Sequence, residues 1–189
     1  VSENATIDFI VNSKSINGNN DVEENLKEGD NKFAVSYKKQ DYNIPYNLEV
    51  SYSTLTPPDN DKAELQMKTN LANKQARVGE TVRMEVEVKN IKDYLQPMAI
   101  AKIGIPAGLS VQPWQLKEIM EKKQVAYYEI FDNYLVFYWM GFAPAETKNI
   151  NLDLKVEIPG TYKGKASNIY LYYTPEYKNW NDGIEIEIK

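Results

Sequence analysis

The segment Thr81-Val-Arg-Met-Glu-Val-Glu-Val-Lys89 alternates apolar and polar side chains along its whole length. Its apolar positions are Val82, Met84, Val86 and Val88. Because successive side chains of a β-strand point to opposite faces, this alternation predicts a strand with one face on a core and the other in water. Strands of that kind are typical of antiparallel sheets packed on one side.

The same period of two recurs in both directions from this segment. Apolar positions alternate at 149–158 and again in the tail, at Ile184, Ile186 and Ile188. Together with turn signals such as Asp132-Asn133, the pattern predicts about eleven strands. These are 5–11, 32–38, 46–53, 63–70, 81–89, 98–105, 125–131, 134–140, 149–158, 167–174 and 184–188. The predicted fold class is therefore all-β, with antiparallel β-sandwiches.

One segment departs from the alternation. Between 114 and 123 the apolar residues Trp114, Leu116, Ile119 and Met120 follow a spacing close to that of a helix. Pro113 stands where proline is favoured, at the first helical position. We expect one short helix here, with its apolar side on a sheet.

A change of composition marks a domain boundary. The run Thr56-Pro-Pro-Asp-Asn-Asp61 cannot continue a central strand, because proline donates no backbone hydrogen bond, so it reads as a linker. We expect two parts, residues 1–57 and 58–189. The first part holds only about three predicted strands, too few to close a sandwich alone.

The composition excludes several classes of function. The 189 residues contain neither histidine nor cysteine, which rules out Cys/His zinc sites, thiol nucleophiles and imidazole general bases within this chain. The net charge of −5 gives no electrostatic basis for binding nucleic acid. The longest apolar runs are too short to cross a bilayer, so no membrane insertion is expected. We also expect no cofactor.

Two acidic groups are candidates for chemistry, each with a simpler interpretation. The oxygen-rich loop 17–24 could hold calcium, but it lacks the spacing of a known calcium loop and favours a solvated turn. Glu129, Asp132, Glu146 and Asp153 lie near aromatic residues and could pair for glycoside hydrolysis. Surface charge that keeps the protein soluble is the favoured interpretation, and we expect no enzyme.

Aromatic residues gather on three predicted strands. They are Tyr127, Tyr128, Phe131, Tyr134, Phe137, Tyr138 and Trp139 on two neighbouring strands, and Tyr170, Tyr172 and Tyr173 on another. Alternation assigns about half of them to the core. The others either form an exposed face for sugars or a protein partner, or pack across strands within one sheet.

Several motifs occur in a characteristic order. They are Met98-Ala-Ile-Ala-Lys-Ile-Gly-Ile-Pro-Ala-Gly-Leu109, the helix, Tyr128-Glu-Ile-Phe-Asp-Asn-Tyr-Leu-Val-Phe-Tyr138, Pro159-Gly-Thr-Tyr162 and Ser167-Asn-Ile-Tyr-Leu-Tyr-Tyr-Thr-Pro-Glu176. This order resembles the carboxy-terminal receptor-binding domain of the α2-macroglobulin and complement family over roughly residues 60–189. Residues 1–57 resemble the second part of the split CUB-type sandwich that precedes that domain.

The resemblance implies the non-catalytic end of a macroglobulin-like broad-spectrum protease inhibitor. Its implied partners are the upstream domains of the same polypeptide and, through the full-length protein, target proteases. The family's thioester cannot lie here, because the chain has no cysteine. A bacterial, extracytoplasmic member is expected, and the chain beginning at Val1 is expected to be a piece of that longer protein.

The resemblance also points to an interaction surface. In animal relatives, lysines on the helix take part in receptor recognition. Lys117 falls near one such position, while the companion position is held by Pro113 or Trp114. The candidate interaction residues are Lys117, Lys122, Lys123, Tyr172 and Tyr173. The alternative function is a carbohydrate-binding or adhesin-type sandwich that uses the exposed aromatic face.

Overall fold

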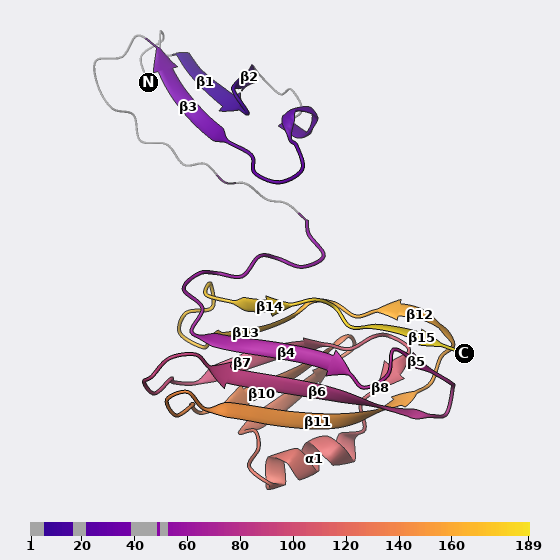
Figure 1. The fold of residues 1–189 in the computed structure, drawn as a ribbon. Helices are drawn as coiled ribbons and strands as arrows, with labels where there is room; N and C mark the ends of the chain where they lie inside the picture. The colour runs from indigo at the N-terminus through magenta and orange to yellow at the C-terminus, as the bar shows by residue number, and fades with distance from the viewer. Residues whose placement is uncertain (1–5, 17–21, 39–48, 50–52) are drawn as a thin grey trace. The chain divides into compact units, whose positions relative to one another are not determined.

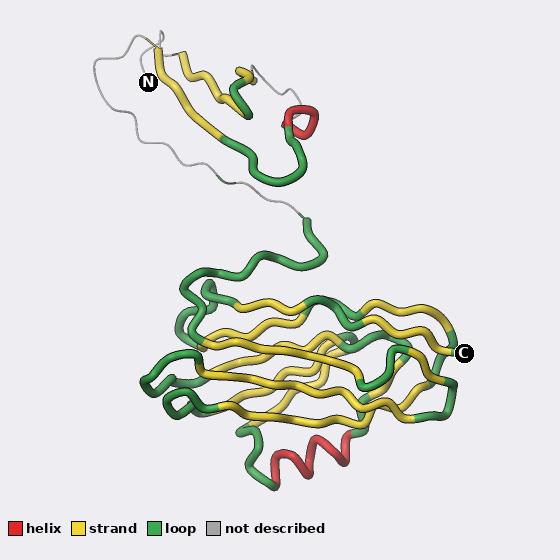
Figure 2. The backbone as a smooth tube through the Cα atoms, in the orientation of Figure 1, coloured by secondary structure: helices red, strands yellow, loops and turns green. Residues whose placement is uncertain are grey.

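The computed structural model describes residues 6–16, 22–38, 49 and 53–189 (Figure 1). The chain divides into two compact units, Val1–Ser51 and Tyr52–Lys189. Nearly all regular structure in the described residues is β-strand in antiparallel sheets, which confirms the predicted fold class (Figure 2).

In the described part of the first unit, three strands form one antiparallel sheet in the order β2-β1-β3. They are β1 (Thr6–Val11), β2 (Lys14–Ile16) and β3 (Phe33–Lys38), with a 3-10 turn η1 at Val22–Asn25. Asn12 and Ser13 join β1 to β2 with φ values of 49° and 70°. Two residues of positive φ make the tight hairpin turn that matches strand twist, and it was not predicted.

Some predictions for the first part cannot be compared with the structure. The predicted strand 46–53 lies almost entirely outside the described residues, as does most of the oxygen-rich loop 17–24. The predicted strands 5–11 and 32–38 are confirmed within one residue at each end.

The second unit contains a five-stranded sheet in the order β14-β13-β7-β10-β9 and a four-stranded sheet in the order β4-β6-β11-β8. The bounds of the first are β7 (Ala99–Gly104), β9 (Tyr127–Phe131), β10 (Tyr134–Trp139), β13 (Ser167–Leu171) and β14 (Asn179–Asn181). Those of the second are β4 (Leu65–Leu71), β6 (Thr81–Asn90), β8 (Leu109–Ser110) and β11 (Thr147–Val156). Every neighbouring pair in these two sheets is antiparallel.

A smaller three-stranded sheet lies near the C-terminus of the unit (Figure 1). It has the order β12-β15-β5, with β5 (Gln75–Ala76), β12 (Gly160–Lys163) and β15 (Glu185–Ile188). The pair β15–β5 is parallel. Four strands of this unit, β5, β8, β12 and β14, were not predicted, because runs of two to four residues carry too little alternation to be recognised.

The core lies between the five-stranded and four-stranded sheets. The register of β6 against β11 pairs Met84 with Leu152 and Val86 with Ile150, so both alternating runs turn the same face inward. They meet Leu135 and Phe137 from the five-stranded sheet in one buried cluster. The alternation at 81–89 therefore predicted the buried face correctly.

The helix α1 (Pro113–Glu121) packs against β11 and β9. Leu116 and Ile119 are buried, as the helical spacing predicted. Trp114 and Met120 were also expected on the apolar side, and this was wrong: both side chains are exposed. The buried residues of α1 are Gln115, Leu116 and Ile119, and at 3.6 residues per turn Trp114 lies on the opposite side of the helix and Met120 at the margin.

Two predicted strands end earlier than expected. β11 stops at Val156, after which the Glu157 amide bonds to the Gly108 carbonyl. β13 stops at Leu171, where the Thr174 amide closes a turn on the Leu171 carbonyl. Apolar residues continue past both strand ends, which is why longer strands were predicted. The backbone nevertheless leaves the sheet there, because the end of a strand depends on pairing partners that are distant in sequence.

Candidate interaction surfaces

The helix lysines lie on the wet side of α1 and just beyond its end. Lys117 is 3.9 Å from Glu121 and Lys122 pairs with Glu118, both one turn apart along the helix. Lys123 has a φ of 58° and is the residue after the C-cap Lys122. These i,i+4 pairs neutralise part of the charge, so the helix presents a mixed surface and not a basic stripe.

The tyrosine pair follows β13. The rings of Tyr172 and Tyr173 meet edge to face, with centroids 5.1 Å apart. Both are exposed, Tyr173 the more so at 76%. The Tyr172 amide donates to the Met98 carbonyl, which anchors the pair at one end of the five-stranded sheet. The structure thus places these tyrosines and the helix lysines on separate elements.

A larger group of aromatic side chains covers the side of the five-stranded sheet that faces away from the core. Cross-strand partners share a face, so the register defines two rows. One row is Tyr127, Tyr138, Ile100 and Tyr170, and the next is Glu129, Val136, Lys102, Asn168 and Trp180. Tyr134 pairs with Phe131 at the end. We call these residues the aromatic face.

Ring–ring and ring–cation contacts order the aromatic face. The rings of Tyr127 and Tyr138 lie 5.9 Å apart, and the Tyr138 hydroxyl bonds to Glu129 at 3.3 Å. The ammonium of Lys102 is 3.9 Å from the centroid of the Tyr134 ring. Such contacts stabilise a cation over the negative face of a ring. Packing across strands is therefore present here, as the simpler interpretation predicted.

Partial burial acts on the phenols of this face. It raises the pKa of Tyr134 and of Tyr170 above the ordinary value. The pKa of Tyr138 is raised by burial first and by the nearby Glu129 carboxylate second. Burial disfavours the charged phenolate, which is why the pKa rises at these three positions.

Sequence reasoning missed several members of the aromatic face. Ile100, Lys102 and Val136 were not singled out, because a strand of small and apolar residues gives no sign of which side faces the core. Trp180 was missed because β14 was not predicted. The alternation of Tyr134, Val136 and Tyr138 was the available signal, and it does place these three on one side.

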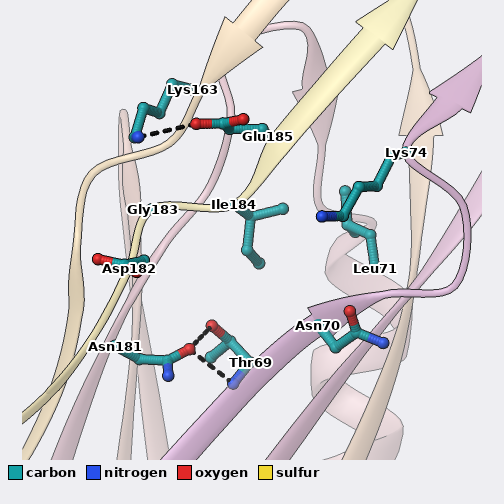
Figure 3. A pocket seen from close by; sticks show the side chains of 10 residues that line it. All are labelled: Thr69, Asn70, Leu71, Lys74, Lys163, Asn181, Asp182, Gly183, Ile184 and Glu185. Atoms are coloured by element: carbon teal, nitrogen blue, oxygen red, sulfur yellow. Dashed lines mark hydrogen bonds and ion pairs between the residues drawn. The ribbon is translucent and has the colours of Figure 1, made fainter.

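A polar pocket of about 400 Å³ lies elsewhere, between the end of β4 and the chain leading into β15 (Figure 3). Two of its four charged groups, Lys163 and Glu185, pair at 2.7 Å, and Asp182 accepts a hydrogen bond from the Thr56 hydroxyl. The amide and hydroxyl of Thr69 both donate to Asn181 Oδ1. Because these bonds hold β14 and β15 to the rest of the unit, we assign the pocket no ligand.

Three of the four carboxylates considered for glycoside hydrolysis, Glu129, Glu146 and Asp153, have structural partners. Asp153 accepts two hydrogen bonds from Arg83, and this pairing lowers the pKa of its carboxyl group. Glu146 accepts a bond from the Ala143 amide and pairs with Lys148 at 3.0 Å. Among the described residues, no three acidic side chains cluster in a way that could hold a metal ion. Within the same residues, no helix has the length and apolar character needed to span a membrane.

With this geometry in place, the chain can be compared with known proteins. Residues 94–181 match the family model of the A-macroglobulin receptor binding domain. A comparison with curated protein sequences finds no significant match.

Solved structures show the same fold. Alpha-2-macroglobulin of Salmonella reacted with methylamine aligns over 70% of this chain with a TM-score of 0.55 and 18% identity. That of Escherichia coli activated by porcine elastase aligns over 70% with a TM-score of 0.56 and 16% identity. The native Escherichia coli protein from domain MG7 to the C-terminus aligns over 72% with a TM-score of 0.52 and 17% identity.

The second unit is thus a β-sandwich with one helix packed across its sheets. Its residues 94–181 match the model of the A-macroglobulin receptor binding domain, and its fold is shared with the solved alpha-2-macroglobulins. The chain resembles the receptor-binding region of bacterial alpha-2-macroglobulins and spans only 10%, 14% and 24% of the three solved chains.

Proposed function

We propose that this chain is the non-catalytic carboxy-terminal part of a macroglobulin-like protease trap of broad specificity. Its role would be to pack on the rest of the polypeptide and to rearrange when a protease activates the molecule. The observation that carries the proposal is the family match over residues 94–181, joined to a fold shared with bacterial alpha-2-macroglobulins.

The build of the second unit supports this role. Side-chain amides bond to the backbone at two places on the four-stranded sheet: Asn179 Oδ1 accepts the Met67 amide on β4, and Gln115 bonds to the Asp153 backbone on β11. Backbone groups that are bonded in this way are not available to pair with another chain. A closed body of this kind can move as one piece while its surroundings rearrange.

The proposal extends to both parts of the chain and to their setting. Residues 1–57 would be the end of a CUB-like sandwich, and residues 58–189 the receptor-binding-like domain. The upstream domains of the polypeptide would be the immediate partners, and target proteases would be reached through the full-length protein. The expected location is extracytoplasmic: periplasmic, cell-surface or secreted.

Lys117, Lys122, Lys123, Tyr172 and Tyr173 are proposed as a recognition surface within this role. The exposure of the tyrosine pair supports it. The placement on two separate elements means that one partner would need to reach both α1 and the end of β13.

The trap is tested with the full-length protein that contains this chain. After incubation with elastase, we expect the elastase to lose activity on a large protein substrate while keeping activity on a small peptide substrate. Elastase with a blocked active site is the matched control and should cause no change in the mobility of the protein on a native gel. Full activity on the large substrate, after complete cleavage of the protein, would contradict the proposal.

The non-catalytic assignment is tested separately with the 189-residue chain. We expect neither inhibition of elastase nor turnover of a broad set of glycosides. Turnover that is lost in Asp153→Asn would overturn the assignment.

A further inference from the structure

The aromatic face is unusual for the outside of a sandwich. Strands that are packed on one side normally turn polar side chains to water. Here the outward rows hold four tyrosines, a tryptophan, a phenylalanine, Ile100 and Val136, with Lys102 and Glu129 as the charged members. Tyrosine and tryptophan are enriched, and charges depleted, at the centres of protein interfaces.

The centre of this face is already dry. Ile100 and Val136 are buried, whereas Tyr127 and Phe131 at the edge are 55% and 54% exposed. Asn168 is also buried, and its Oδ1 has no hydrogen-bond partner among the described residues. A buried acceptor without a donor is costly, so Asn168 Oδ1 lowers the stability of this part of the sheet.

The ring faces argue against a sugar as the occupant. The Tyr134 ring has the ammonium of Lys102 at 3.9 Å and that of Lys165 at 5.3 Å. The Tyr170 ring has Lys178 at 4.8 Å. A sugar stacks on an open ring face. On the Tyr134 and Tyr170 rings, lysine ammonium groups already occupy a ring face.

The charges instead suit a protein surface that brings carboxylates. Lys102, Lys165 and Lys178 lie over the rings, while the single acidic member, Glu129, is bonded to Tyr138. Asp59, which accepts the Trp180 amide, borders the face as well, but Lys102 and Lys165 form no ion pair with any described residue, so their charges are available to carboxylates of a partner. A pocket of about 430 Å³ between Leu55, Tyr134 and Trp180 borders the face and offers a notch for a partner side chain.

We propose that the aromatic face is the surface through which the second unit docks on another domain of its own longer polypeptide. The docked domain would present carboxylates among apolar side chains, placed to meet Lys102 and Lys165. This inference rests on the proposed function, which supplies the longer polypeptide: the solved chains that share the fold are several times longer than the aligned part.

The test is hydroxyl-radical footprinting of the 189-residue chain and of the full-length protein. Oxidation of Tyr127 and Phe131 should be several-fold slower in the full-length protein. Tyr94, which is similarly exposed but lies in the loop before β7, is the control and should change far less. Equal oxidation of the two face residues in both proteins would overturn the inference.

A charge reversal gives a second readout. In the full-length protein, Lys102→Glu should weaken docking about tenfold, equivalent to 1.4 kcal/mol, because like charges would then face each other. The readout is the rate of limited proteolysis at residues 53–62, with Lys68→Glu on β4 as the matched control. If the two variants are cleaved at the same rate, the proposed charge complementarity is wrong.

The remaining outcomes separate the alternatives. Glycan binding by the chain that is lost in Tyr127→Ser would overturn the inference in favour of a sugar. Protection of the face in a dimer of the isolated chain, seen by sedimentation, would overturn it in favour of a second copy. A full-length protein that protects the face but traps no protease would leave the docking surface standing and contradict only the proposed function.

Discussion

The side-chain amide of Gln115 bonds to the backbone of Asp153 as a residue of a neighbouring strand would. Its Nε2 donates to the Asp153 carbonyl at 2.7 Å, and its Oε1 accepts the Asp153 amide at 2.8 Å. β8 pairs with β11 only at Lys155 and Val156. The Gln115 side chain of the helix therefore supplies the backbone hydrogen bonds of β11 at Asp153, where β8 no longer reaches. The bond joins α1 to the four-stranded sheet independently of the apolar contacts of Leu116 and Ile119.

Replacing this amide should destabilise the fold. Gln115→Leu keeps the apolar volume but leaves an amide and a carbonyl of β11 without partners, at a cost of about 2 kcal/mol in the free energy of unfolding. Urea denaturation measures the loss. Gln124→Leu, an exposed position just past the helix, is the matched control. Equal effects of the two substitutions would mean that the Gln115 bonds contribute little.

The end of α1 offers a stabilising substitution. The Lys123 amide bonds to the Met120 carbonyl and the Gln124 amide to the Ile119 carbonyl, a termination in which the left-handed residue is usually glycine. Lys123 has a φ of 58°, which costs about 1–2 kcal/mol for a residue with a Cβ. Lys123→Gly should therefore raise the free energy of unfolding by about 1 kcal/mol.

The neighbouring lysine is the control for that experiment. Lys122 has a φ of −75°, so Lys122→Gly gains no relief and should be neutral or destabilising. Thermal unfolding of the two variants separates these outcomes. A destabilised Lys123→Gly would show that the lysine side chain contributes more than its backbone strain costs.

Gly104 permits a close crossing of two chain segments. A Cβ at this position would lie 1.9 Å from the Lys165 carbonyl oxygen, which belongs to backbone and cannot turn away. Gly104→Ala should cost at least about 3 kcal/mol, because the ladder of β7 must shift to relieve the clash. The measurement is the midpoint of urea denaturation.

Gly79→Ala is the comparison that isolates the clash. Gly79 has a φ of 91°, and a Cβ added there would have no atom within 4 Å. Its substitution by alanine therefore causes backbone strain but no steric clash. We expect a loss of about 1–2 kcal/mol there. If Gly79→Ala proves the more damaging of the two, the crossing at Gly104 is looser than the structure indicates.

The phenols of the aromatic face predict a loss of stability in alkali. Burial raises the pKa of Tyr134, Tyr138 and Tyr170 in the folded protein above the ordinary value of about 10. Between these values the unfolded chain has lost protons that the folded protein keeps. Stability is therefore fully present below pH of about 10 and falls as the pH rises further.

Thermal unfolding measured across this range checks the sign. Tyr138→Phe removes one of the phenols and should make the melting temperature fall less steeply with pH. A slope that is unchanged in Tyr138→Phe would contradict the burial of this hydroxyl. A melting temperature that rises in alkali would contradict the prediction as a whole.

The long strands could be predicted because their signal is local. Val82 to Val88 and Ile150 to Leu154 each repeat the period of two often enough to mark both the strand and its buried face. The helix could also be predicted, because Leu116 and Ile119 have helical spacing and follow Pro113 at the first helical position. The order of motifs from Met98 to Glu176 also indicated the receptor-binding family model that matches residues 94–181, because each motif is a run of consecutive residues.

The edges and the aromatic face could not be predicted in this way. Asn179 Oδ1 accepts the Met67 amide on β4, although the two residues are more than a hundred positions apart. No local pattern near either residue predicts this hydrogen bond. Lys102 became part of the aromatic face only because β7 lies between β10 and β13. Strand order decides such neighbours, and strand order is set by packing of the whole unit.

The sequence alone therefore determined which of the longer segments become strands, where the single predicted helix lies and which faces of β6 and β11 are buried, because side-chain period is a property of consecutive residues. Only the tertiary structure decided that the outward tyrosines of three strands meet on one surface with lysines over their rings. It also decided that Gln115 completes a sheet. Both depend on which distant segments become neighbours, and that is fixed by the closure of one common core.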